Sequence, residues 1–222
     1  MRVNIMQKMI VTVGLAVIVA CFSTAALAQQ PMSAPRAAMN NSNNRHLGFF
    51  LRPDLGLGYL SASETAGSTD VSISGLAGTF GLDIGGAFVE DWIIGVHVYD
   101  AVATNPTVSV GSRSGTAQNA SLSMLAIGPS LTHYFQPTNV YFTFTPAVTT
   151  MTTTRSSGAS NNTDIGFGAK VAIGKEWWVS EHWGLGLNTH AAFSTNGDPI
   201  AAGGSNTLSA WSFGLAFSAT YN

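Results

Sequence analysis

The chain has 222 residues, of which only 9% are charged, 45% are hydrophobic and 24 are glycine; its formal net charge is −2. An ordinary soluble domain carries about 25% charged residues, so part of this surface is expected to face something other than water. The sequence shows no basic patch of the kind that binds nucleic acid, and nucleic acid is therefore excluded as a partner.

Residues 1–28 have the three parts of a secretory signal peptide. Arg2 and Lys8 supply a positive start, residues 9–20 form an apolar run, and Ala26-Leu27-Ala28 has the small-x-small form cut by signal peptidase. The apolar run is shorter than the roughly 20 residues of a transmembrane helix. We predict export and cleavage after Ala28.

Cys21 offers an alternative N-terminus, because Ile18-Val19-Ala20-Cys21 resembles a bacterial lipobox. In that alternative Cys21 is lipidated and retained. The complete cleavage site downstream favours removal of residues 1–28, and the mature chain then has no cysteine, disulfide or thiol chemistry.

Residues 29–46 mix Pro, Ala and Asn without periodicity, and we predict a disordered periplasmic leader there. From residue 47 onward the dominant pattern is alternation of apolar with small or polar residues, which is typical of β-strands. Leu55, Leu57 and Tyr59, for example, oppose Arg52 and Asp54. Eight segments show this pattern, each long enough for a tilted transmembrane strand: residues 51–59, 76–84, 92–99, 124–132, 140–148, 165–174, 183–193 and 211–221.

The connections alternate in length, which is independent evidence for the same fold. Three are short, at residues 87–91, 136–139 and 178–182, and four are long and rich in Ser, Thr, Asn and Gly, at residues 61–70, 103–119, 150–163 and 195–206. Short periplasmic turns and long external loops are typical of a transmembrane β-barrel. We therefore predict an all-β, eight-stranded antiparallel up-and-down barrel over residues 47–222 in the outer membrane of a Gram-negative-type bacterium. A soluble β-sandwich or lipocalin-like barrel is the alternative, and it would place the apolar residues inside.

Aromatic residues cluster beside the short connections, where an interfacial girdle is expected. The predicted girdle consists of Trp92, Tyr134, Tyr141, Trp177, Trp178 and Trp183.

Three stretches resemble the small outer-membrane β-barrel superfamily that includes OmpA/OmpX-like and OmpW-like proteins: residues 128–135, 174–179 and 183–187. The final strand, with Trp211, Phe213, Leu215, Phe217 and Tyr221, is similar to that family's C-terminal assembly signal. The resemblance implies contact with membrane lipid and lipopolysaccharide, and recognition by the outer-membrane assembly machinery through the C-terminal strand.

A set of polar residues falls on the predicted inner face: Arg52, Asp54, Asp83, His97, Tyr99, Lys170 and His190. One interpretation is a path for protons or small solutes. The other is a structural network that plugs the barrel, and we favour it because buried charges must be paired to be tolerated.

Enzymatic chemistry finds little support. His190 and Ser194, followed by Asp198, suggest a hydrolase of the lipid A-modifying kind, but residues i and i+4 of a strand lie about 13 Å apart. The five histidines have no metal-ligand spacing, and neither a catalytic residue, a metal nor a cofactor is predicted.

The remaining candidate binding sites are the long connections, where we predict Arg113 and Arg155, at two tips, as contact residues. We predict a non-enzymatic structural or surface-interaction barrel whose extracellular ligand the sequence does not name. A narrow OmpW-like channel for small or apolar solutes is the first alternative, and a lipid A-modifying enzyme is the second.

Overall fold

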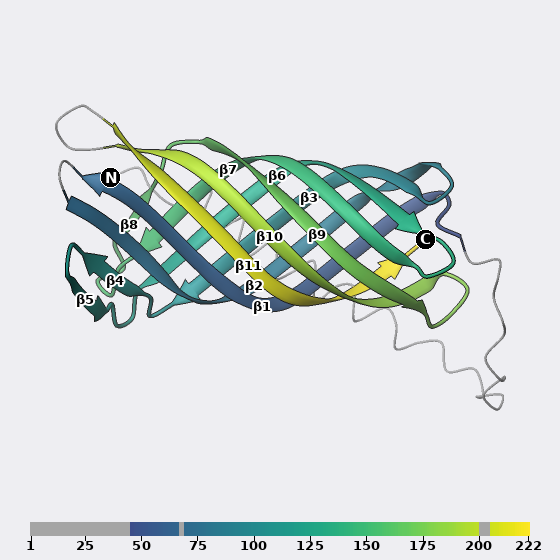
Figure 1. The fold of residues 1–222 in the computed structure, drawn as a ribbon, viewed down its shortest axis with the longest axis horizontal. Helices are drawn as coiled ribbons and strands as arrows, with labels where there is room; N and C mark the ends of the chain where they lie inside the picture. The colour runs from purple at the N-terminus through teal and green to yellow at the C-terminus, as the bar shows by residue number, and fades with distance from the viewer. Residues whose placement is uncertain (1–44, 67–68, 200–204) are drawn as a thin grey trace. The chain divides into compact units, whose positions relative to one another are not determined.

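The computed structural model describes residues 45–66, 69–199 and 205–222. The predicted signal peptide and nearly all of the predicted leader lie outside these residues. In the described part no helix is long and apolar enough to cross a membrane. The described residues form eleven strands (Figure 1): β1 (Phe49–Ala66), β2 (Thr69–Val89), β3 (Trp92–Thr104), β4 (Thr107–Val110), β5 (Arg113–Thr116), β6 (Ser121–Phe135), β7 (Val140–Thr154), β8 (Ser160–Asn162), β9 (Gly166–Trp178), β10 (Trp183–Pro199) and β11 (Ser205–Tyr221).

The eight long strands form a closed antiparallel barrel. Along the chain each pairs with the next, in the order β1, β2, β3, β6, β7, β9, β10 and β11. The barrel closes because β11 pairs with β1, in a register that runs from Leu51 opposite Tyr221 to Ser63 opposite Ser209. Closure pairs the wall strands on both sides, as a sheet in lipid requires. The predicted eight-stranded fold is confirmed.

The predicted long loops are wrong in one respect, because much of their length is β-hairpin. β1 and β2 stay paired as far as Ala66 and Thr69, and β10 and β11 as far as Pro199 and Ser205. The short strand β4 pairs with β2 on one side and with β5 on the other, and β8 pairs with β7. Ser, Thr and Gly predict loops when read by composition, but they also suit strands exposed to water on both faces. These hairpins form what we call the rim.

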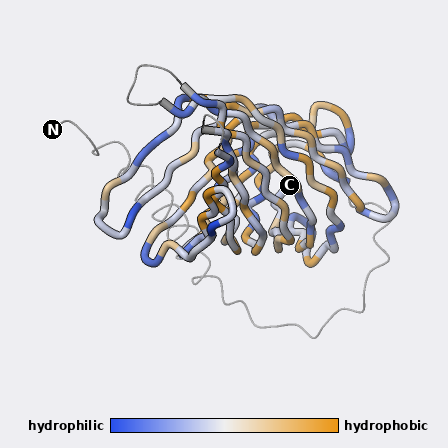
Figure 2. Tube along the Cα trace, turned by 60° about the vertical axis from the view of Figure 1, so that its left-hand side comes forward, coloured by the Kyte–Doolittle hydropathy of each residue, from blue (hydrophilic) through white to orange (hydrophobic). Residues whose placement is uncertain are grey.

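The outside of the barrel carries an apolar band. Leu55, Leu57, Leu76 and Leu215 are each at least 70% exposed, an arrangement that is unfavourable in water and favourable in hydrocarbon. Figure 2 shows apolar positions recurring along the strands, with more hydrophilic colours in the projecting hairpins. On six strands the apolar series ends at a polar residue toward the rim: Ser61, Ser74, Ser123, Thr150, Thr195 and Ser209.

The inside of the barrel differs between its two halves. The half next to the rim is filled by a buried apolar cluster that includes Leu60, Leu122, Met124 and Met151 together with many alanines, each of these four at most 1% exposed. The other half holds charged, hydroxyl and aromatic side chains. Small residues opposite large ones make this filling possible: the ring of Tyr141 lies over Gly174, where any Cβ would collide with it.

The longest interruption of the wall lies between β6 and β7; a shorter one lies between β1 and β11, at Arg52 and Pro53. The register of β6 and β7 runs through Ile127 opposite Val148 and resumes at Leu131 opposite Phe144. Pro129 and Pro146 face each other in the interval, and neither has a backbone N–H to donate. Beside them Gly128 approaches the carbonyl oxygen of Pro146 so closely that no side chain would fit. We call this interval the proline seam.

Candidate functional site

The structure places all seven predicted interior residues inside the barrel. Each is at most 6% exposed: Arg52, Asp54, Asp83, His97, Tyr99, Lys170 and His190. They come from β1, β2, β3, β9 and β10, and we call them the interior network.

Arg52 is the centre of the network's charge pairing. Its guanidinium donates to Asp83 Oδ2 at 3.1 Å and to Thr143 Oγ1 at 2.9 Å. It also donates to the Tyr134 hydroxyl at 3.2 Å and lies over the Tyr141 ring, 4.3 Å from its centre. Such pairing offsets the large cost of burying a charge.

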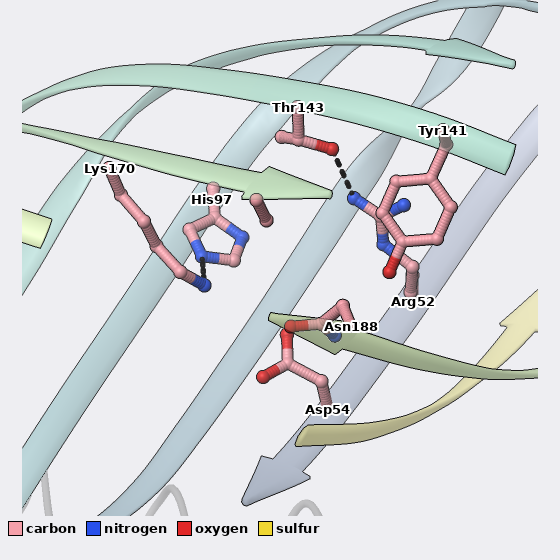
Figure 3. A pocket seen from close by; sticks show the side chains of 8 residues that line it. Arg52, Asp54, His97, Tyr141, Thr143, Lys170 and Asn188 are labelled. Carbon is pink, nitrogen blue, oxygen red and sulfur yellow. Dashed lines mark hydrogen bonds between the residues drawn. The ribbon is translucent and has the colours of Figure 1, made fainter. Parts of the chain in front are cut away.

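Lys170 and His97 form the second part of the network and point toward each other in Figure 3. Lys170 Nζ donates to His97 Nε2 at 2.8 Å and lies 4.4 Å from the centre of the Tyr99 ring. On the other side of the imidazole, Nδ1 lies 3.6 Å from Asp83 Oδ2. Asp83 therefore lies between Arg52 and His97 and connects the two parts.

Tyr99 and His190 continue the network toward the apolar cluster. The Tyr99 hydroxyl lies 3.3 Å from His190 Nε2 and 2.9 Å from Ser212 Oγ. Beyond them lies the apolar cluster, and on its rim side the polar residues Ser194, Asn196 and Thr149 are also buried, with Thr149 Oγ1 donating to Asn196 Oδ1 at 3.2 Å.

A cavity of about 10 Å³ lies within the network. A volume of this size holds about one water molecule. It is lined by Arg52, Asp54, His97, Tyr141, Thr143, Lys170, Ala172 and Asn188 (Figure 3). The cavity is too small to be a conduit for a solute.

Three of the six predicted girdle residues are placed differently from the prediction. Tyr134 and Tyr141 are each 1% exposed and point inward, because both occupy inward positions of their strands. Trp178 also follows the inward register and tilts against His46, with ring centres 5.0 Å apart. Trp92, Trp177 and Trp183 are 38–50% exposed on the outer face, where a headgroup position stays a prediction.

Glu176 is an interior charge that the sequence analysis missed. Its carboxylate accepts from the Tyr134 hydroxyl at 2.8 Å and from Thr220 Oγ1 at 2.6 Å, and it lies 4.0 Å from Arg52. Counting by twos from Lys170 would have placed it on the inner face. Its neighbours Trp177 and Trp178 led to the prediction of an interfacial girdle at this position instead.

Arg45 and His46 belong with the barrel and not with the predicted leader. His46 is fully buried at the short-turn end, and its ring stacks on Tyr134 at 3.5 Å between centres. The His46 backbone N–H donates to Asp91 Oδ1, and Arg45 Nη1 donates to Asp91 Oδ2 at 2.6 Å. Their partners are far away in sequence, so no local pattern marked them.

The His46 ring is held by two asparagines from different parts of the chain. Nδ1 lies 3.1 Å from Asn222 Oδ1, and Nε2 lies 3.2 Å from Asn139 Oδ1 in the β6–β7 turn. Burial lowers the pKa of His46 below its ordinary value, although Glu176 and Asp91 act in the opposite direction. For Asp91, burial raises the pKa, but hydrogen bonds from Gln136 and Arg45 bring it below the usual value.

The suggested catalytic set is not assembled. Ser194 Oγ contacts Met124 Sδ at 3.6 Å, while His190 contacts Tyr99 and Asn188. Within the described ranges no three His, Cys, Asp or Glu side chains converge as metal ligands. Arg113 and Arg155 are exposed in the rim region, and their role as contact residues stays a prediction.

The closed sheet, the apolar outer band and the polar residues within define a transmembrane β-barrel of the bacterial outer-membrane class. The sequence matches no known protein family, and no curated protein matches it. Among solved structures the fold is similar to that of Neisserial surface protein A, with a TM-score of 0.55 and 15% identity over 78% of this chain and 96% of that one. The outer membrane protein OprG from Pseudomonas aeruginosa has a TM-score of 0.49 and 15% identity, over 80% of this chain and 98% of that one. The outer membrane protein AlkL has a TM-score of 0.47 and 13% identity, over 87% of this chain and 96% of that one.

Proposed function

We propose that this protein is a closed, non-enzymatic barrel that anchors the rim as a contact surface outside the cell. One observation carries the proposal: the interior is filled. The apolar cluster occupies the rim half, and the cavity within the interior network of the other half measures about 10 Å³. Loops and hairpins on a rigid scaffold are the usual place for binding, and Arg113 and Arg155 are the exposed cations there.

Single-channel recording in planar bilayers tests the closed interior. The wild-type barrel is expected to give no conductance steps. The triple variant L60A/L122A/M124A removes apolar filling and is expected to introduce steps. The matched control L55A/L57A/L76A truncates three leucines on the outer face and is expected to remain silent. Regular steps from the wild-type barrel would contradict the proposal.

Photo-crosslinking in intact cells tests the rim. A photoreactive amino acid at position 113 or 155 is expected to form adducts with a saccharide or protein outside the membrane. The same group at Leu57, on the apolar band, is expected to form lipid adducts only. If neither rim position gave a non-lipid adduct, the contact role would be wrong.

The second candidate function is passage of small apolar solutes. The observation that favours it is the chemistry of the rim half, where Ile73 and Leu208 extend the apolar cluster toward the outside. Uptake of a fluorescent apolar probe by cells with and without the protein distinguishes the candidates, since only a solute channel predicts faster uptake.

A further inference from the structure

Arg45 and His46, which we call the latch, close the end of the barrel that carries the short turns. Short turns face the periplasm in barrels of this class. The latch contacts both the β2–β3 turn, through Asp91, and the β6–β7 turn, through Asn139. It also contacts Asn222 after β11. These contacts join parts of the chain separated by 45, 93 and 176 residues.

We propose that the latch is a pH-sensitive closure, held shut by neutral His46 and loosened when His46 is protonated. This inference concerns the periplasmic end and does not depend on whether the barrel conducts.

The surroundings of His46 suit a neutral ring. The imidazole stacks on Tyr134 at 3.5 Å and lies 5.0 Å from Trp178, and no part of it is exposed to water. A neutral ring has one donor and one acceptor nitrogen. Asn139 Oδ1 also accepts from Gln136 Nε2 at 3.2 Å, so it suits a donating Nε2 of His46. The amide nitrogen of Asn222 has no partner among the described residues, so this amide can turn to donate to Nδ1.

The nearby carboxylates are already occupied. Asp91 accepts from Arg45 at 2.6 Å and from Gln136 at 3.0 Å. Glu176 accepts from the Tyr134 hydroxyl at 2.8 Å and from Thr220 at 2.6 Å. An imidazolium at position 46 would compete with these donors without regaining its hydration.

The remaining charged groups near the latch do not favour a buried imidazolium. Arg45, in the latch itself, repels a second cation, and its Nε pairs with Glu90 at 3.1 Å. His182, from the β9–β10 turn, contacts the carbonyl oxygen of Asn222 at 3.1 Å. The effect of burial on the pKa of His46 therefore exceeds the opposite effect of Glu176 and Asp91, and the pKa of docked His46 lies below its ordinary value.

The direction of the pH effect follows from linkage. A released latch takes up a proton near pH 6.5, the usual histidine value, whereas a docked latch takes it up only at lower pH. Docking is therefore strongest above pH 6.5 and weakens as the pH falls through this window. At pH 5 the ratio of open to docked latch can increase by at most about 30-fold relative to neutral pH.

Hydrogen exchange of the protein in detergent micelles tests the closure. The informative amides are those of His46 and Asp91, because the His46 N–H donates to the Asp91 side chain and the Asp91 N–H donates to the His46 carbonyl. After correction for intrinsic rates, the opening of both is expected to increase several-fold to about 30-fold between pH 7.5 and pH 5. The amide of Asn139, bonded within its own turn to Phe135, serves as the reference and is expected to change less.

Two variants give the control. H46Q removes the titrating ring and is expected to show equal protection of the Asp91 amide at both pH values. H182Q removes another histidine at this end, one that contacts Asn222, and is expected to retain the wild-type response. An unchanged wild-type protection, or an equal response in H46Q, would overturn the proposal. If H46Q does not fold, NMR titration of the wild-type imidazole decides, since a His46 pKa at or above 6.5 contradicts the closure.

Discussion

Arg52 is the residue on which the charge pairing of the interior depends. It connects β1 to Asp83 on β2, Tyr134 on β6, Thr143 on β7 and, at 4.0 Å, Glu176 on β9. A buried carboxylate that loses its partner costs far more than an exposed one. Removal of Arg52 leaves two such carboxylates.

We expect R52M to lower the free energy of unfolding by about 3–5 kcal/mol, because Asp83 and Glu176 become uncompensated. Urea unfolding in micelles, followed by tryptophan fluorescence, measures the change. K175M is the matched control, since Lys175 lies on the outer face, and it should cost less than about 0.5 kcal/mol. Equal stabilities for the two variants would show that the interior charges are hydrated.

For single residues, the alternation along a strand predicted correctly whether a side chain points into the barrel, whereas closeness to a short turn did not. The alternation placed Arg52 and Lys170 inside correctly. Tyr134 and Tyr141 were assigned to the girdle because they are near a short turn, although both occupy inward positions. His46 could not be found from the sequence, because its burial depends on two asparagines far along the chain.

At the scale of the strands, the proline seam sets β6 and β7 apart from the other pairs. Two facing prolines remove two donors from the ladder, and the seam lies in the wall beside the interior network: Lys170 is opposite Thr145, and His97 is opposite Gly128. A lipid-facing wall normally satisfies its backbone groups internally. The seam is therefore the part of the wall where local opening is least costly.

P146V supplies a backbone N–H to the seam and should slow hydrogen exchange of the flanking amides of Thr145 and Ala147. We expect stabilisation of about 0.5–1.5 kcal/mol, the net value of one hydrogen bond. The control P53V lies on β1, at the shorter interruption between β1 and β11, and should leave exchange in β6 and β7 unchanged. Faster exchange in P146V would show that the proline ring is needed for packing.

The strand ends show where composition is insufficient. Residues 61–70 and 195–206 have the Ser, Thr and Gly content of loops, yet the structure pairs most of their described residues as hairpins. Hydrophobic alternation identifies a strand only where one face meets lipid or core. Above the apolar band both faces are polar, and the pattern that identifies the strand disappears.

At the scale of the whole molecule, the apolar band fixes the position of the barrel in the bilayer. On β11 it covers Leu215, 70% exposed near the middle of the strand, and ends before Ser209. The eightfold alternation was enough to predict this arrangement, because lipid outside and a narrow lumen inside impose the same constraint on each strand. It could not predict which interior half would be apolar, since alanine and glycine fit either.

L215R tests the band directly. An arginine at the midplane should cost about 2–4 kcal/mol, whereas the same change nearer the interface should cost at most about 1 kcal/mol. S209R, on the same strand and face, is the matched control. The folded fraction after refolding into lipid vesicles, read from the heat-dependent shift on gels, should fall for L215R alone. Similar losses in both variants would place the bilayer elsewhere on the barrel.

The length of β2 sets how far this protein projects from the cell. Of its 21 residues, those from Thr69 to Ser74 stand beyond the apolar band. At about 3.3 Å per residue and a tilt near 40°, they rise roughly 15 Å. A large partner can therefore reach this projecting part of β2 only where the surrounding surface polysaccharide extends no further from the membrane than the strand does. The length of the polysaccharide would then control access without any change in the protein.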